Sequence, residues 1–240
     1  GHVRTLLAKV KSVELVLLYA QAYAEHGWSR TVLEWQIEQR FHERAGQAVG
    51  NFAQTLPAPQ SELVQQSLKD PYVFDFLTLA PQAVERDIEN QLVAQITRFL
   101  LELGKGFAFL GRQYPLAVNG RDYFLDLLFY HARLKCYVVI ELKAGEFKPE
   151  YVGKLNFYLS AVDDQLRDKG DQPTIGLILC KDKDKLDVEY ALRDIHKPMG
   201  VSSFITKDIP LAVQSQLPTV QEIESELTAL IHDQENKPDE

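Results

Sequence analysis

The sequence contains only two cysteines, Cys136 and Cys180, and no CxxC spacing of the kind that binds zinc. Both lie at apolar, strand-like positions, so we expect buried thiols rather than a disulfide. No stretch approaches the roughly 20 apolar residues of a membrane span, and no secretory signal is present, which together favour a cytoplasmic protein. The sequence also lacks a glycine-rich phosphate loop, so it does not favour ATP hydrolysis.

Basic residues are in the minority, and the formal net charge is −8. Most of this imbalance lies in the last thirty residues, where Lys237 faces seven acidic residues. The rest of the chain is nearly neutral, and a bound metal would neutralise some of its acids. Charge alone therefore neither requires nor excludes nucleic acid as a partner. We expect the acidic tail, 211–240, to be a solvated helix with a frayed end.

Two carboxylates interrupt apolar runs that otherwise predict buried strands. Asp126 lies within the run 123–130, and Glu141 and Lys143 end the next run. Both runs are rich in aromatic and β-branched residues and are too short for comfortable helices. Alternate side chains of a strand share a face, so Glu141 and Lys143 point the same way and Leu142 points into the opposite layer. Because an unpaired buried carboxylate is costly, we expect Asp126 and Glu141 to bind a divalent metal; a buried ion pair with Lys143 is the alternative.

The order of the other elements predicts an α/β protein with a mixed sheet. Helical periodicity prevails up to a soft boundary near residue 80, with helices from Leu6 to a stop at Gly27 and from Ser29 or Thr31 to Gly46. Asn119-Gly120 predicts a hairpin turn. The elements expected beyond residue 80 are a helix over 82–103, strands over 107–114, 123–130 and 136–143, a helix from Pro149, a strand over 174–180, a helix over 186–196, a strand over 201–205 and a tail helix over 220–231.

An Asp in the second of these strands and Glu-x-Lys at the end of the third resemble the PD-(D/E)xK nuclease superfamily. Longer blocks resemble bacterial YhcG-type proteins, a family long filed as a domain of unknown function. These blocks are 56–61, 70–77, 101–109, 126–131 (DLLFYH), 137–143 (YVVIELK) and 154–158 (KLNFY).

The resemblance covers about residues 28–215. It implies a restriction-endonuclease-like core over 81–210, in which helices flank a mixed sheet, with a helical segment over 1–80 before it. Family members usually carry a longer helical N-terminal region, and Gly1-His2 is typical of a cloning scar, so we expect the natural start to lie upstream.

The resemblance also implies roles for individual residues. The backbone carbonyl of Leu142 becomes a further metal ligand. Glu89 becomes an acid that contacts the metal directly or through water, with Glu85 on the same helical line as the competing candidate. The alternative for Glu89 is a solvated helix face.

Lys154 and Tyr158 lie four residues apart on one helix face, where several branches of the superfamily carry Gln-x-x-x-Tyr near the metal and the DNA. Lys154 replaces that Gln, so we expect contact with phosphate without assuming the family geometry. The alternative for Tyr158 is a core position. Gln113 is a weaker nucleic-acid-binding candidate at the rim of the cleft.

These residues predict an endonuclease that uses Mg²⁺ or Mn²⁺ to hydrolyse phosphodiester bonds in DNA, with Asp126, Glu141 and Lys143 as catalytic residues. Lys143 would position or deprotonate the attacking water and stabilise charge on the phosphate. The resemblance implies a setting in repair, recombination or mobile-element defence. Two alternatives stay open: a module that docks nucleic acid or protein without cleavage, and an RNase. A homodimer and an unidentified defence or repair partner also stay open.

Overall fold

The computed structural model describes residues 1–80 and 82–208, and residues 1–207 form one compact unit. The helix expected over 220–231 lies outside the described residues. No helix within them is long and apolar enough to cross a membrane. The helices are α1 (His2–Lys9), α2 (Val13–His26), α3 (Arg30–Glu38), α4 (Phe41–Arg44), α5 (Phe52–Thr55), α6 (Gln60–Ser67), α7 (Glu85–Ala94), α8 (Ile96–Leu103), α9 (Glu150–Gln165) and α10 (Lys185–Leu192).

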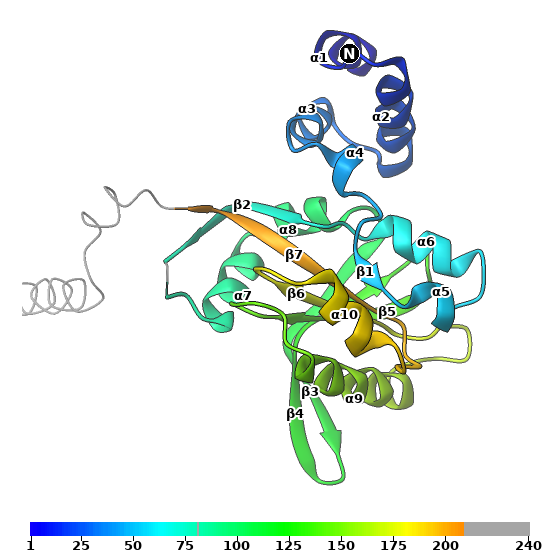
Figure 1. Cartoon of the computed structure of the whole chain (residues 1–240), viewed down its shortest axis with the longest axis vertical. Coiled ribbons are helices and arrows are strands. Elements are labelled where there is room, and N and C mark those ends of the chain that lie inside the picture. The colour runs from blue at the N-terminus through cyan, green and yellow to red at the C-terminus, as the bar shows by residue number, and fades with distance from the viewer. Residues whose placement is uncertain (81, 209–240) are drawn as a thin grey trace, which may run out of the picture. The chain divides into compact units, whose positions relative to one another are not determined.

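A seven-stranded mixed sheet forms the centre of this unit (Figure 1). The strand order is β1-β7-β6-β5-β4-β3, and β2 pairs with β7 off this path. Strands β3, β4 and β5 are antiparallel neighbours, whereas β5, β6 and β7 run parallel. The strands are β1 (Val49–Gly50), β2 (Tyr72–Leu79), β3 (Phe107–Val118), β4 (Arg121–His131), β5 (Cys136–Leu142), β6 (Ile175–Cys180) and β7 (Met199–Asp208).

Two apolar layers cover the sheet. One lies between the sheet and helices that include α7 and α8, where Ile88 and Phe99 pack with Leu127. The other lies between the sheet and α9 and α10, where Leu155 packs with Val139. Strand β6 is buried along its whole length, which explains its uninterrupted apolar sequence. The predicted mixed sheet flanked by helices is confirmed.

The antiparallel half of the sheet begins with a long hairpin. Asn119 and Gly120 both have positive φ, 49° and 71°, as a two-residue turn of this kind requires. The predicted hairpin turn is therefore confirmed. In Figure 1 the β3–β4 hairpin projects beyond α9, which contacts β3.

Several predicted helices are shorter than expected. The first breaks between α1 and α2, because Ser12 caps α2 by accepting a hydrogen bond from the Leu15 N–H. The helix expected up to Gly46 ends at Glu38, and Arg40 (φ 51°) precedes the separate α4. The helix expected over 82–103 divides at Gln95, whose ψ of 33° interrupts the helical path.

The aromatic stretch before residue 80 is not a connection between domains. It forms strand β2, which pairs with β7 and buries Tyr72, Phe74 and Leu77 in the layer beneath α7 and α8. The prediction of an entirely helical segment up to residue 80 is therefore wrong for the residues of β2. Strand pairing between residues so far apart in sequence satisfies backbone groups that the aromatic core would otherwise leave buried and unpaired.

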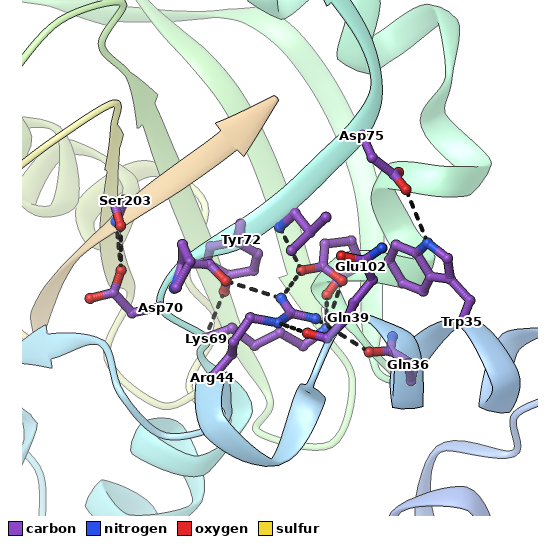
Figure 2. A network of polar contacts seen from close by, with 12 residues as sticks. Trp35, Gln36, Gln39, Arg44, Lys69, Asp70, Tyr72, Asp75, Glu102 and Ser203 are labelled. Atoms are coloured by element: carbon purple, nitrogen blue, oxygen red, sulfur yellow. Dashed lines mark hydrogen bonds and ion pairs between the residues drawn. The ribbon is translucent and has the colours of Figure 1, made fainter. Parts of the chain in front are cut away.

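A buried charged network joins the N-terminal helices to the sheet unit (Figure 2). Glu102 of α8 is fully buried and accepts hydrogen bonds from Arg44 of α4, from the Val73 N–H at 2.8 Å and from Lys69 Nζ at 3.2 Å. Arg44 Nε also donates to the Gln39 carbonyl at 2.8 Å. Burial lowers the pKa of Lys69, and the Glu102 charge opposes that shift. The network gives α4, α8 and β2 one shared set of charge-assisted contacts.

Candidate active site

The structure brings Asp126 and Glu141 together on neighbouring antiparallel strands. Leu127 pairs with Ile140, so Asp126 and Glu141 occupy the next position of the same register. The backbone N–H of Leu142 donates to Asp126 Oδ2 at 2.9 Å. The Leu142 side chain packs in the opposite layer, as strand alternation predicted. The two carboxylates therefore occupy the end of the β4–β5 pair, on the α9 side of the sheet.

The backbone is irregular at this point of the hairpin. Leu125 packs beneath α9, whereas Leu127 packs in the layer of α7 and α8, although strict alternation would place both on one face. Gln113, which lies opposite Asp126, has a φ of 42°. Few residues other than glycine adopt positive φ, and such departures often accompany functional sites. This irregularity lies between the tip of the hairpin and the part of β4 that pairs with β5. Asp126 lies at the irregularity.

Glu141 is the most buried carboxylate of the site, with 1% of its surface exposed. Its Oε2 accepts hydrogen bonds from Lys154 Nζ at 2.9 Å and from Lys143 Nζ at 3.4 Å. Its Oε1 is buried and has no hydrogen-bond partner in the structure. Burial first, and the Asp126 charge second, raise the pKa of Glu141, while both lysines oppose the shift. An unpartnered carboxylate oxygen beside a second carboxylate fits the oxygen ligands that a divalent cation prefers.

Two lysines frame Glu141 from different elements. Lys143 follows β5, is 9% exposed, and holds its Nζ 5.1 Å from the ring centroid of Tyr151. Lys154 projects from α9 and holds its Nζ 5.2 Å from the ring of Tyr158. Burial lowers the pKa of Lys154, but the charge and hydrogen bond of Glu141 more than offset this and raise it. Both ammonium groups therefore have an aromatic face and a carboxylate as neighbours.

The remaining predicted residues lie around this centre. Glu89 on α7 is 4% exposed and accepts a hydrogen bond from Gln113 Nε2. Glu85 Oε1 accepts from the Ala144 N–H at 3.3 Å. In the part of the chain that the structure describes, no three His, Cys, Asp or Glu side chains form a group that could hold a metal ion. The structure thus pairs Glu89 with Gln113 and does not group it with Asp126 and Glu141.

Three aromatic residues near the site, Tyr123, Tyr151 and Phe157, were not predicted from the sequence to have a role. Tyr151 carries Lys143 over its ring, and Tyr123 of β4 packs against Phe157 of α9. Phe157 lies three residues after Lys154, a helical spacing that places it near the same face. That spacing was the available signal. The partner of Phe157 depends on the angle between α9 and the hairpin, which the sequence does not contain.

Comparisons with known proteins identify the family to which this chain belongs. A family model described as "YhcG PDDEXK nuclease domain" matches residues 65–218. The Escherichia coli (strain K12) protein named "Putative nuclease YhcG" is 35% identical over 201 residues, which are 82% of this chain and 54% of that protein. The fold is therefore the PD-(D/E)xK, restriction-endonuclease-like core. The chain belongs to the YhcG family and spans about half the length of this curated relative.

Solved structures offer only distant likenesses. A repair endonuclease from Pyrococcus abyssi matches with a TM-score of 0.36 and 15% identity, over 55% of this chain and 50% of that one. The structure of an EndoMS–dsDNA2 complex matches with a TM-score of 0.37 and 18% identity, over 57% of this chain and 49% of that one. These scores are too low to bear on function, and the family assignment rests on the sequence matches.

Proposed function

We propose that this chain is a divalent-metal-dependent nuclease that hydrolyses phosphodiester bonds in DNA. The observation that carries the proposal is the pair Asp126 and Glu141 at the end of adjacent strands, with Glu141 Oε1 buried and unpartnered. Membership of a nuclease family supports the reaction class. Mg²⁺ and Mn²⁺ are the proposed ions, because hard oxygen ligands suit both.

The proposed catalytic residues have two roles: the carboxylates bind the metal ion, and Lys143 stabilises charge on the phosphate. Asp126, Glu141 and the Leu142 carbonyl would hold the ion. Glu89, which the structure pairs with Gln113 and not with these carboxylates, would act on the ion through water. A divalent ion, when bound, neutralises charge on a phosphate and lowers the pKa of water. Lys143 provides a compact positive charge that stabilises the negative charge developing on the phosphate.

The bonds in the reaction balance as in any phosphodiester hydrolysis. A water oxygen forms a bond to phosphorus while the bond between phosphorus and the leaving sugar oxygen breaks. Lys143 would position the attacking water, which loses its proton to solvent, and the leaving oxygen gains a proton from solvent. Lys154 lies at the edge of the site with a side chain that is 45% exposed and would contact a neighbouring phosphate. Gln113 is a further proposed nucleic-acid contact. Tyr158 is 5% exposed and packs in the apolar layer under α9, so its proposed role is to support Lys154 from beneath.

DNA in the bacterial cytoplasm, in repair, recombination or mobile-element defence, is the setting that the family resemblance suggests, and it is part of this proposal. The direct test is incubation of the chain with Mg²⁺ or Mn²⁺ and linear duplex, single-stranded, branched and RNA substrates. Asp126→Asn should abolish cleavage. Asp122→Asn, an exposed acid on the same strand, should leave it unchanged.

The outcomes separate the candidate functions. Cleavage of DNA by the parent and by Asp122→Asn, but not by Asp126→Asn, supports the proposal. Cleavage of RNA alone would replace DNA with RNA as the substrate. Binding of DNA with no cleavage of any substrate, in either metal, would overturn the nuclease assignment in favour of a docking module.

A further inference from the structure

An aromatic pair lies between the hairpin and α9, next to the candidate active site. The ring centroids of Tyr123 and Phe157 are 4.8 Å apart, with an angle of 55° between the ring planes. Phe157 is 37% exposed although it lies on a helix whose opposite face is fully packed. Tyr123 is half-buried and precedes Asp126 by three residues on β4. The pair therefore presents aromatic surface to solvent from two rigid elements.

A continuous series of contacts connects this aromatic pair to Glu141. Lys154 Nζ contacts Glu141 Oε2 at 2.9 Å, and the same Nζ lies 5.2 Å from the ring of Tyr158. The ring of Tyr158 is 6.0 Å from that of Phe157, which in turn contacts Tyr123. The Glu141 carboxylate of β5 is thus followed by the Lys154 ammonium group and the Phe157 ring of α9, with the buried ring of Tyr158 between the last two. A nucleotide has the matching sequence of groups: a phosphate and, beyond its sugar, a flat base.

We infer that Tyr123 and Phe157 stack an unpaired nucleobase next to the phosphate that is cleaved. This inference rests on the proposed function and specifies its substrate class: nucleic acid with an unpaired strand at the cleavage point, such as a flap, a branch or a single strand. Within a duplex the base faces are already stacked on one another. Aromatic side chains reach them only when a base is unstacked or flipped out.

The positive charge of Lys154 beside the aromatic pair favours a nucleobase over another apolar occupant. Lys154 is the exposed cation beside the pair, and aromatic residues interleaved with cations are the usual means of binding single strands. Phe124 offers a matched comparison on the same strand. It is 48% exposed and, among the described residues, makes no aromatic contact, and its side chain points to the face opposite Tyr123. Exposure alone therefore does not distinguish Phe157; its place beside Lys154 does.

The test uses the Asp126→Asn background, which prevents cleavage, and oligonucleotides that carry 2-aminopurine at an unpaired position or within a duplex. Stacking on an aromatic ring quenches the fluorescence of this base. We expect quenching only for the unpaired probe. Phe157→Ala and Tyr123→Ala should each weaken binding of the flapped oligonucleotide by about 5- to 150-fold, the range for one stacked base. Binding of the blunt duplex should change less than about twofold.

Phe157→Leu keeps apolar bulk without an aromatic face and should weaken binding as much as Phe157→Ala does. That result would exclude loss of side-chain packing as the cause of the weaker binding. Phe124→Ala should leave both affinities unchanged. Equal losses for flap and duplex, or unchanged quenching in Phe157→Ala, would overturn the inference. The proposed function fails separately: if the parent chain binds and quenches the unpaired probe but cleaves nothing with Mg²⁺ or Mn²⁺, stacking stands and the nuclease assignment falls.

Discussion

Asp126 accepts a hydrogen bond of 2.9 Å from the backbone N–H of Leu142, across the boundary between β4 and β5. This contact fixes one Asp126 oxygen beside the backbone that carries Glu141 and Lys143. Because the donor is part of a buried strand, the carboxylate needs no mobile side chain to hold its orientation. Preorganisation of this kind is what a metal-binding or catalytic carboxylate requires.

Glu141 should reduce the stability of the metal-free protein at neutral pH. Its pKa in the folded state lies above the ordinary value of 4.5, so the folded chain holds this proton more tightly than the unfolded chain. The stability linked to Glu141 is therefore greatest below pH 4.5 and falls as the pH rises through the folded-state pKa. Glu141→Gln, which resembles the protonated acid, should therefore unfold at a higher temperature than the parent at pH 7.

Thermal unfolding at pH 4 and pH 7 checks this expectation, with Glu146→Gln, an exposed acid in the following segment, as the control. The advantage of Glu141→Gln should disappear at the lower pH. Mn²⁺ should raise the unfolding temperature of the parent but not of the variant. A variant that is less stable than the parent at pH 7 would contradict the raised pKa.

Lys143 should contribute to the rate far more than to binding. Its charge matters most when negative charge develops on the phosphate, so Lys143→Ala should lower kcat by roughly a hundredfold or more. Affinity for DNA should change little, since one phosphate contact is a small part of an interface made of many. Cleavage and gel-shift assays on the same preparation measure both quantities. Lys148→Ala, an exposed lysine before α9, is the matched control, and normal cleavage by Lys143→Ala would assign the lysine a structural role.

Glu102 should be among the most sensitive positions for stability. Glu102→Gln removes the counter-charge of two buried cations, Arg44 and Lys69, and should lower the free energy of unfolding by about 3–5 kcal/mol. The comparison is Glu43→Gln, whose partner Arg40 is exposed, and which should cost less than about 1 kcal/mol. Urea unfolding distinguishes the two. Equal and small losses would show that the network in Figure 2 contributes little to stability.

Local signals in the sequence were sufficient for much of the fold. Apolar runs interrupted by Asp126 and Glu141 predicted two strands, and Asn119-Gly120 predicted the turn before them. The sequence did not reveal β2, because its partner β7 lies more than a hundred residues further along and such pairing leaves no local trace. The break at Gln95 was also missed, since the apolar spacing of α7 and α8 continues across it.

For the candidate site too, local sequence signals were sufficient for some residues, and contacts between distant elements were not predictable. Charged residues within apolar strands identified Asp126, Glu141 and Lys143, because burial of such groups needs a reason. Glu89 and Gln113 were each identified singly, but their mutual hydrogen bond depends on how α7 crosses the hairpin. The contacts of Tyr151 with Lys143 and of Phe157 with Tyr123 likewise depend on the placement of the segment that leads into α9 and of α9 itself. Residue types were predictable, whereas packing angles between elements were not.

Calorimetric titration of the metal-free chain with Mn²⁺ measures whether Asp126 and Glu141 together bind a divalent cation. We expect the parent and Asp122→Asn to bind a single ion with the same heat. The double variant Asp126→Asn, Glu141→Gln, which conserves side-chain shape and is first shown to be folded, should give no binding heat. Equal Mn²⁺ binding by this double variant and the parent would exclude a metal site at these two carboxylates.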